Sequence, residues 1–205
     1  MNLKLYKQLS LIALLLANGM VQGAINLNIN PTTQTGNSVE IGIAISGLDS
    51  GAAPSLSTYD LDLKYDSNQL SFVGAAFGDP VLGNQLDLLN FGSNLTAAEI
   101  SSSGVVNLFE LSFDSPGELN SLQADSFTLA TLTFNVLGAG TSQFDIVINA
   151  LGDADGNSLG DVTATSVAIT TVPLPPASFM MFSGLFAVLA TKRNRRDEIM
   201  LANQI

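Results

Sequence analysis

The chain has 205 residues, a formal net charge of −11, and neither cysteine nor histidine. Without these two residue types it has no disulfide, no Ser-His-Asp or Cys-His nucleophile, and none of the usual zinc sites. It also lacks tryptophan, a flat aromatic side chain on which carbohydrate-binding proteins commonly stack sugar rings.

The charges are distributed unevenly along the chain. Residues 24–171 contain sixteen of the eighteen acidic residues and a single cation, Lys64, so this segment has a formal charge of −15. Such a segment repels nucleic acid and anionic polysaccharide, and it attracts cations, calcium among them, or a basic protein partner. We therefore expect no nucleic-acid partner. Solubility of a sheet-rich protein is the alternative explanation for the charge.

Residues 1–23 are predicted to be a secretory signal peptide. Two lysines precede a short apolar stretch, residues 9–17, and small residues follow up to Gly23. We predict cleavage between Gly23 and Ala24. A cut after Gly19 and an uncleaved anchor are the alternatives. Export places the segment that follows outside the cytoplasm.

The central segment alternates apolar and polar residues with the period of half-buried strands. Turn-forming residues separate the strands, and residues 118–123 are the only segment predicted to form a helical turn. A change of apolar phase within 127–136 predicts a β-bulge. Together these features predict one all-β sandwich domain of eight or nine strands. The predicted strands lie near 25–29, 39–46, 59–65, 70–77, 105–113, 127–136, 144–150 and 162–170, with a short one near 86–91.

Two stretches of this segment resemble the opening of a cohesin domain. They are Val39-Glu-Ile-Gly-Ile-Ala-Ile-Ser-Gly-Leu48 and Tyr59-Asp-Leu-Asp-Leu-Lys-Tyr-Asp-Ser-Asn-Gln-Leu-Ser-Phe72, and Phe127–Phe134 fits the same pattern. The resemblance implies a cohesin-like jelly-roll sandwich of about nine strands over residues 24–171. Cohesins bind dockerin modules through one flat sheet face. The implied function is therefore non-enzymatic binding of a dockerin-like or basic protein, or of extracellular polysaccharide.

A polar loop precedes the last strand. Asp153, Asp155, Asn157 and Asp161 stand at the first, third, fifth and ninth positions of a calcium-loop alternation. The sixth and twelfth positions lack the glycine and glutamate of an EF-hand, and no helix flanks the loop. Two interpretations stay open, a calcium site formed by these four residues and a plain hairpin turn, and the turn is favoured. The fold itself requires no cofactor.

Three carboxylates follow one another on a predicted strand and its end. Asp60, Asp62 and Asp66 are predicted to share one face with Lys64. Side chains two residues apart on a strand lie about 6.5–7 Å apart, within the carboxylate separations of glycosidases. A catalytic pair also needs a cleft that raises one pKa, and nothing in the sequence indicates a cleft. We predict a solvated or partner-facing strand and no catalytic residue.

The C-terminal part combines a proline motif, an apolar run and a basic cluster. Residues 172–176 predict a rigid, extended spacer, because proline joins neither a helix nor a sheet ladder. The apolar residues 177–191, with flanking residues, predict one transmembrane helix. By the positive-inside rule, the cations that follow the apolar run are predicted to be a cytoplasmic stop-transfer signal. Residues 197–205 are then predicted to be a short cytoplasmic tail. A buried C-terminal helix is the alternative. The stop-transfer cations are Lys192, Arg193, Arg195 and Arg196.

This order resembles the PEP-CTERM sorting signal in its Val-Pro-Leu-Pro-Ala form. Members of that family are secreted by Gram-negative bacteria and passed to the membrane transpeptidase exosortase. The resemblance implies an exosortase-type processing partner, an inner-membrane intermediate, and a final place at the cell surface or in an exopolysaccharide or biofilm matrix. A permanently anchored surface protein and a structural matrix component without a specific ligand are the alternatives. The implied sorting motif is Val172, Pro173, Leu174, Pro175 and Pro176.

Overall fold

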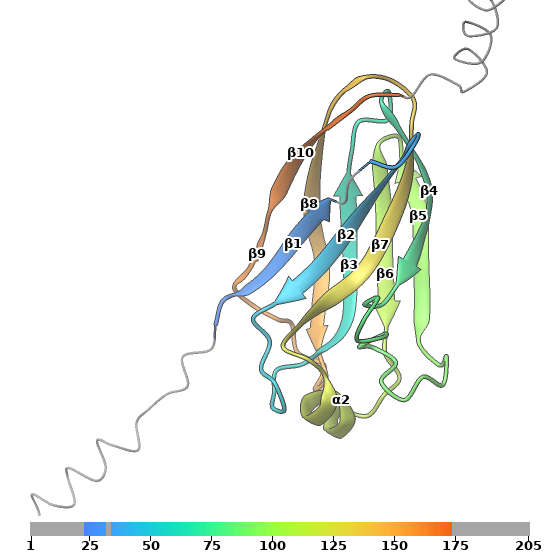
Figure 1. The fold of residues 1–205 in the computed structure, drawn as a ribbon. Helices are drawn as coiled ribbons and strands as arrows, with labels where there is room; N and C mark the ends of the chain where they lie inside the picture. The colour runs from blue at the N-terminus through green and yellow to red at the C-terminus, as the bar shows by residue number, and fades with distance from the viewer. Residues whose placement is uncertain (1–22, 32–33, 174–205) are drawn as a thin grey trace, which may run out of the picture.

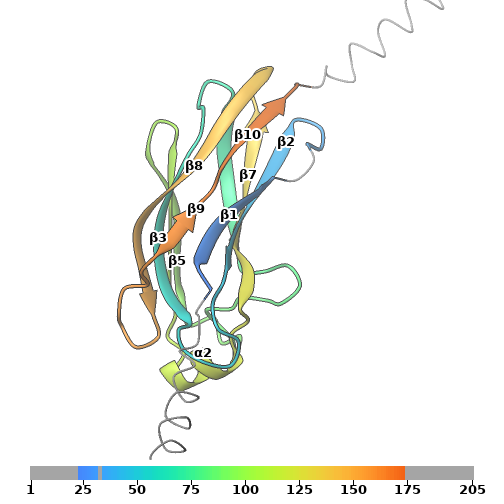
Figure 2. The same ribbon diagram turned by 90° about the vertical axis from the view of Figure 1, so that its left-hand side faces the viewer.

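The structure, a computed structural model, describes residues 23–31 and 34–173. These residues form two five-stranded sheets packed face to face (Figures 1 and 2). One has the order β4-β7-β2-β1-β9 and is called the β2 sheet; the other, β10-β8-β3-β6-β5, is called the β3 sheet. The strands are β1 (Ile25–Pro31), β2 (Ser38–Ser46), β3 (Leu56–Lys64), β4 (Leu70–Phe77), β5 (Leu95–Ser102), β6 (Val105–Leu111), β7 (Ser126–Val136), β8 (Gly140–Asp153), β9 (Val162–Ala164) and β10 (Ser166–Thr171).

The prediction of an all-β sandwich is confirmed, but the strand list needs two corrections. The prediction of a short strand near 86–91 is wrong, because these residues lie in the loop between β4 and β5. The strand β5 was missed. It lies at the edge of the β3 sheet, where most of its residues are exposed, so it lacks the alternation of buried and exposed residues that marks a half-buried strand.

Two local predictions are confirmed. In the pairing of β2 with β7, Ile43 lies opposite Ala130 and Ala44 lies opposite Thr128, which leaves Leu129 as the extra residue of a bulge. The helical turn is α2 (Pro116–Leu122), whose capping box is formed by Ser115 and Glu118.

The last predicted strand is divided between the two sheets. β9 pairs with β1 in the β2 sheet, and β10 pairs with β8 in the β3 sheet. Thr165 lies at the crossing, where its N–H donates to the Leu27 carbonyl and its hydroxyl accepts from the Ile29 N–H. The chain therefore runs along the open edge of the sandwich and bridges both layers there (Figure 2).

Aliphatic and aromatic side chains from both sheets form one core. The alternating residues of β2 and β3 face inward, and Phe134 of β7 contacts three other rings, those of Tyr65, Phe72 and Phe144. Fully burying one such side chain stabilises the fold by about 1.5–3 kcal/mol. The same alternation directs the polar residues of each strand outward, which creates two broad outer faces.

The ends of the chain lie outside the described residues. This concerns the predicted signal peptide up to residue 22, the sorting motif from Leu174 on, the predicted transmembrane helix, the stop-transfer cations and the cytoplasmic tail. In the part of the chain that the structure describes, no helix is long and apolar enough to cross a membrane. The described chain ends next to Gln34, whose side-chain amide donates to the Val172 carbonyl and accepts from the Val172 N–H.

Candidate interaction face

The outer face of the β3 sheet brings together side chains from four neighbouring strands, β8, β3, β6 and β5. Because Tyr59, Leu61 and Leu63 point into the core, the intervening residues of β3 point to solvent. The register then fixes their neighbours on β6 and β8. We call this surface the Asp60 face, and its central members are Asp60, Asp62 and Lys64 of β3, Asn107 and Phe109 of β6, Asp145, Val147 and Asn149 of β8, and Leu95, Ala97 and Glu99 of β5.

Two asparagines hold the central carboxylates in place. The Asn107 side-chain amide donates to Asp60 Oδ1 at 2.7 Å and to Asp62 Oδ1 at 2.9 Å. Asn149 donates to the same Asp60 oxygen at 3.1 Å. Asn149 reaches this oxygen because a register shift in β8 inserts it between the partners of Asp60 and Leu61. Each carboxylate keeps acceptor capacity for a ligand while its orientation is fixed.

An apolar strip borders this polar centre on the β5–β6 side. Leu95 lies opposite Leu111, and Ala97 lies opposite Phe109. Leu95 is 54% exposed although it is a large aliphatic residue. Apolar contact area beside oriented polar groups is the arrangement found at the centres of protein–protein interfaces. The face therefore suits a macromolecular partner better than a small substrate.

A long loop, residues 78–94, connects β4 to β5 beside this strip and is held by a buried glutamate. Glu110 points inward from β6 and is fully buried. Its carboxylate accepts from Asn84 and Asn94, both at 2.6 Å, and from the Tyr59 hydroxyl at 2.9 Å. Burial raises the pKa of Glu110, although these three hydrogen bonds oppose the rise. The middle of the loop and its C-terminal end are thus tied to one carboxylate.

The tip of the same loop presents apolar side chains in a fixed conformation. Val81 is 87% exposed, and Leu82 is 51% exposed. Their N–H groups donate to Asp79 Oδ1, while Thr128 N–H donates to Asp79 Oδ2. Burial acts to raise the pKa of Asp79, but the backbone hydrogen bonds lower it to about 2. Loops of this length without regular structure are usually functional or disordered, and this one is ordered by its polar contacts.

The structure separates the carboxylates that the sequence grouped together. Asp60, Asp62 and Lys64 lie on the Asp60 face as expected. Asp66 lies beyond the end of β3, where its carboxylate accepts from the backbone and side-chain amides of Asn68 and from the Gln69 side chain. Asp66 therefore shapes a turn.

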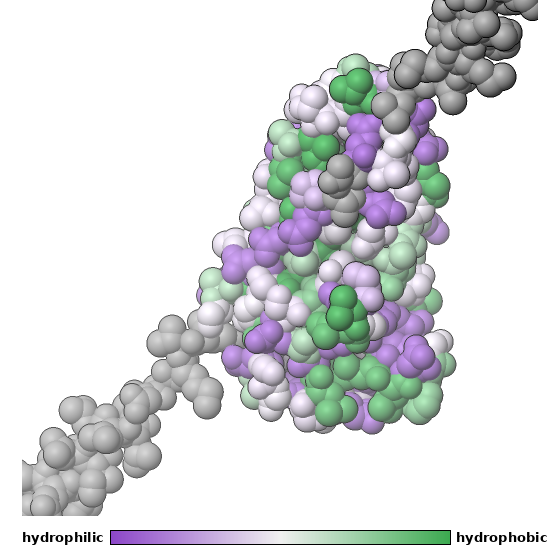
Figure 3. Space-filling model, viewed as in Figure 1, coloured by the Kyte–Doolittle hydropathy of each residue, from purple (hydrophilic) through white to green (hydrophobic). Residues whose placement is uncertain are grey.

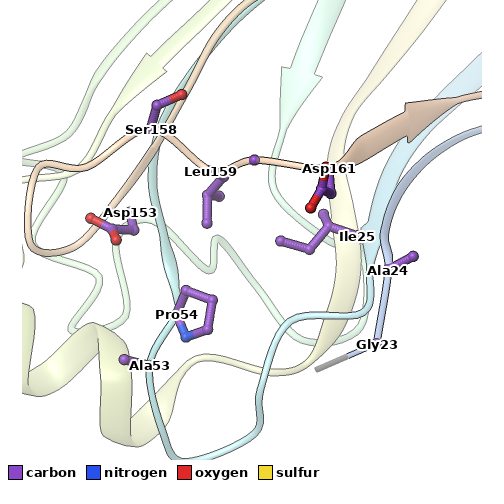
Figure 4. A pocket seen from close by; sticks show the side chains of 10 residues that line it. Gly23, Ala24, Ile25, Ala53, Pro54, Asp153, Ser158, Leu159 and Asp161 are labelled. Atoms are coloured by element: carbon purple, nitrogen blue, oxygen red, sulfur yellow. The ribbon is translucent and has the colours of Figure 1, made fainter. Parts of the chain in front are cut away.

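The polar loop after β8 has the contacts of a hairpin turn. Asp153 Oδ1 accepts from the N–H groups of Asp155 and Asn157, and Asp153 Oδ2 accepts from the Asn157 side chain. Asp153 and Asp161 lie on different sides of a pocket of about 580 Å³, with Pro54 and Leu159 also in its lining (Figure 4). Among the described residues, no group of three or more His, Cys, Asp or Glu side chains is arranged to hold a metal. The calcium site stays a prediction.

Asp153 provides a test of how this loop is stabilised. We expect Asp153→Ala to lower the free energy of unfolding by about 1 kcal/mol, because two backbone donors lose their acceptor. Asp155→Ala is the control, since the Asp155 side chain is exposed, and its effect should stay within about 0.5 kcal/mol. Thermal unfolding with and without added calcium measures both effects. A calcium-dependent rise in Tm that Asp155→Ala abolishes would establish the metal site instead.

Three functional residues of this region were not predicted from the sequence, Asn107, Asn149 and Glu110. One of them left a signal. Glu110 follows Val106 and Leu108 in the same inward phase, so the alternation places a carboxylate in the core. The contacts of the two asparagines depend on the order of strands across the sheet, which a single sequence does not reveal.

Comparisons with known proteins agree on the fold. The profile of the cohesin domain matches residues 25–171. The chain is similar to the sixth cohesin of Acetivibrio cellulolyticus scaffoldin B, solved in complex with a mutant dockerin, with 21% identity, a TM-score of 0.53, and coverage of 74% of this chain and 99% of that one. It is also similar to a cohesin from Clostridium thermocellum in a cohesin–dockerin complex, with 14% identity, a TM-score of 0.55, and coverage of 72% and 98%.

A third similar structure is the non-cellulosomal cohesin from the archaeon Archaeoglobus fulgidus, with 16% identity, a TM-score of 0.52, and coverage of 72% of this chain and 91% of that one. At such identities the likeness shows the fold alone. No curated protein matches the sequence.

Proposed function

Because the chain belongs to the cohesin family, whose domains are non-catalytic binding modules, we propose that it binds a protein module through the Asp60 face. The observation that carries this proposal is the pair of carboxylates, Asp60 and Asp62, held by Asn107 beside an exposed apolar strip. The pair is fixed before a ligand arrives, so binding loses little conformational entropy there.

The charge of the domain defines the chemistry of the partner. Residues 24–171 have one cation against sixteen acidic residues, so a partner with a basic surface is attracted and oriented. The solved cohesins of Acetivibrio cellulolyticus and Clostridium thermocellum are each in complex with a dockerin. By this likeness the proposed partner is a dockerin-like module whose contact surface carries lysine or arginine around apolar residues.

Calorimetric titration of the purified chain with a panel of dockerin modules tests the proposal. We expect saturable binding of the modules that carry a basic contact surface, weakened by added salt. No binding by any module of the panel at micromolar concentrations would contradict it.

We also propose that the protein is exported and sorted by an exosortase-type enzyme, and that the released form belongs to the cell surface or the exopolysaccharide matrix. Two observations support this proposal. One is the proline motif, and the other is its position immediately after the folded domain. Gln34 holds both backbone groups of Val172, so the motif begins directly at the folded domain. The alternatives remain a permanent membrane anchor and a structural matrix component without a specific ligand.

The intact mass of the exported protein tests the sorting proposal. We expect a species that begins at Ala24 and ends near Pro175 or Pro176, because an extended proline-rich backbone is accessible to a processing enzyme. The measurement is mass spectrometry of culture medium and membrane fractions. A membrane-bound species that retains residues 192–205 would favour the permanent anchor.

A further inference from the structure

The outer face of the β2 sheet differs in chemistry from the Asp60 face. Its outward residues on β4, β7, β2 and β1 are serine, threonine, asparagine, glycine and alanine, with one exposed valine, Val73 at the bulge of β4, and a single carboxylate, that of Glu40. We call this surface the Thr131 face, after its central residue. Figure 3 shows mostly white and pale atoms beside a purple band along β1, with a green patch lower on the same side. A domain with sixteen acidic residues thus has one broad face that is almost uncharged.

The centre of this face carries hydroxyl groups that are available to a ligand. Thr131 of β7 lies between Gly42 and Ala76, and Thr133 lies between Gly74 and Glu40, the one carboxylate of this face. A Cβ added at Gly74 would meet no atom within 4 Å, so the space beside Thr133 is open. Neither threonine hydroxyl has a hydrogen-bond partner among the described residues. The two side chains form a ridge of hydroxyl and methyl groups about 6.5–7 Å apart.

The asparagines of β1 extend this row of polar groups. Asn26 and Asn28 point outward, next to Ser46 and Ala44 of β2. The Asn28 side chain donates to the Ser46 hydroxyl at 3.3 Å, which leaves its second amide hydrogen and its carbonyl oxygen for other partners. Hydroxyl and amide groups both donate and accept, so the face matches a ligand that does the same.

The charges decide which ligand fits. An anionic polymer is repelled by the domain as a whole, and a basic partner is drawn to the Asp60 face. A second copy of the chain has an equally acidic domain and is therefore repelled. An uncharged chain rich in hydroxyl groups meets none of these penalties. From the uncharged face and its unpartnered hydroxyls, we propose that the Thr131 face binds a neutral polysaccharide.

This second surface does not depend on the protein partner proposed for the Asp60 face. The two faces belong to opposite sheets of the sandwich (Figure 2), so one domain can hold both ligands at once. No aromatic ring is directed outward at the centre of the Thr131 face, because Phe72 turns inward onto Phe134. Binding therefore rests on hydrogen bonds repeated along a polymer, and each single contact is weak.

Affinity electrophoresis of the full chain in a polyoxyethylene detergent tests the proposal. The gels contain a soluble neutral β-glucan, a neutral α-glucan, a neutral galactomannan, or anionic alginate. We expect retardation by at least one neutral polymer and none by alginate. The double variant Thr131→Val with Thr133→Val keeps β-branched side chains but removes both hydroxyls. Its association constant for the neutral polymer should fall about tenfold, the effect expected from the loss of one or two hydrogen bonds.

Two controls separate this proposal from the other interpretations. Thr131→Ser with Thr133→Ser keeps the hydroxyls and should keep binding, while Asp60→Asn with Asp62→Asn leaves the glycan contact unchanged and weakens only the dockerin-type contact. No retardation by any neutral polymer, or retardation that the valine pair does not reduce, would overturn the proposal. Sedimentation that shows self-association abolished by the valine pair would also overturn it, because the occupant would then be a second copy.

Discussion

Replacing Glu110 with alanine is expected to lower the free energy of unfolding by about 3 kcal/mol. Glu110 is fully buried, and its carboxylate is the shared acceptor for Tyr59, Asn84 and Asn94. Each buried donor that loses its partner costs about 1–3 kcal/mol, and the two loop asparagines recover part of this cost by moving into water. Urea denaturation of the domain measures the change.

The same substitution should release the loop between β4 and β5. Asn84 lies within this loop and Asn94 at its end, so without Glu110 the segment between them loses both of its anchors. We expect faster amide exchange and earlier proteolytic cutting between residues 84 and 94 than in the unmodified protein. Glu110→Gln is the matched control, because it keeps one acceptor oxygen in the same shape, and its cost should be about 1–2 kcal/mol. Equal stability of all three proteins would contradict the role of Glu110.

The pH dependence of stability separates the charge of Glu110 from its shape. Its pKa in the folded state lies above the ordinary value of 4.5, so its protonated form is favoured by folding. The contribution of Glu110 is complete below pH 4.5 and is lost as the pH rises through the raised pKa. Asp79, with its pKa lowered from 3.8 to about 2, acts in the opposite direction and loses its contribution as the pH falls through about 2. Glu110→Gln should abolish the first dependence and leave the second.

Reversing one charge on the Asp60 face is expected to weaken partner binding about 100-fold, which corresponds to about 2.7 kcal/mol. In Asp62→Lys the cation would both repel a basic partner and remove an acceptor that Asn107 holds in place. Glu40→Lys is the control, because it makes the same change of charge on the opposite sheet. Its effect should be limited to about threefold, through long-range attraction alone. Calorimetric titration with a dockerin module that binds the unmodified protein gives both values.

Equal losses in the two variants would mean that net charge alone, rather than the Asp60 face, governs binding. Thermal unfolding of both variants shows whether they remain folded. Asp62→Lys loses the hydrogen bond from Asn107 and should lower the free energy of unfolding by about 1 kcal/mol, whereas Glu40→Lys, at an exposed position, should stay within about 0.5 kcal/mol.

The fold was predictable from the sequence wherever one strand face is buried. Apolar and polar residues alternate regularly in β2 and β3, because one side of each strand packs into the core. The bulge of β7 was visible in the sequence as a change in the phase of its apolar residues. β5 lies at a sheet edge, where only Ala97 and Ala98 are half-buried and the other residues are exposed, so burial imposes little pattern on it. The apolar residues near 86–91 suggested a strand, but Leu86 is buried within a loop that polar contacts hold in place.

The candidate site was predictable only in part. Asp60 and Asp62 were identified because carboxylates at outward positions of one strand are visible in the sequence. Their partner Asn107 lies on β6, and Asn149 lies on β8, two strands that flank β3 although they are far from it in the sequence. Strand order is set by the packing of the whole sandwich, so no local pattern contains these contacts.

Binding of the protein partner through the Asp60 face, as proposed, can be tested directly. The side-chain amide signals of the asparagines report on both faces in one NMR titration with a bound dockerin module. Binding at the Asp60 face should shift the signals of Asn107 and Asn149, whose amides contact Asp60, and leave those of Asn26 and Asn28 on the opposite sheet unchanged. Shifts confined to Asn26 and Asn28 would contradict it.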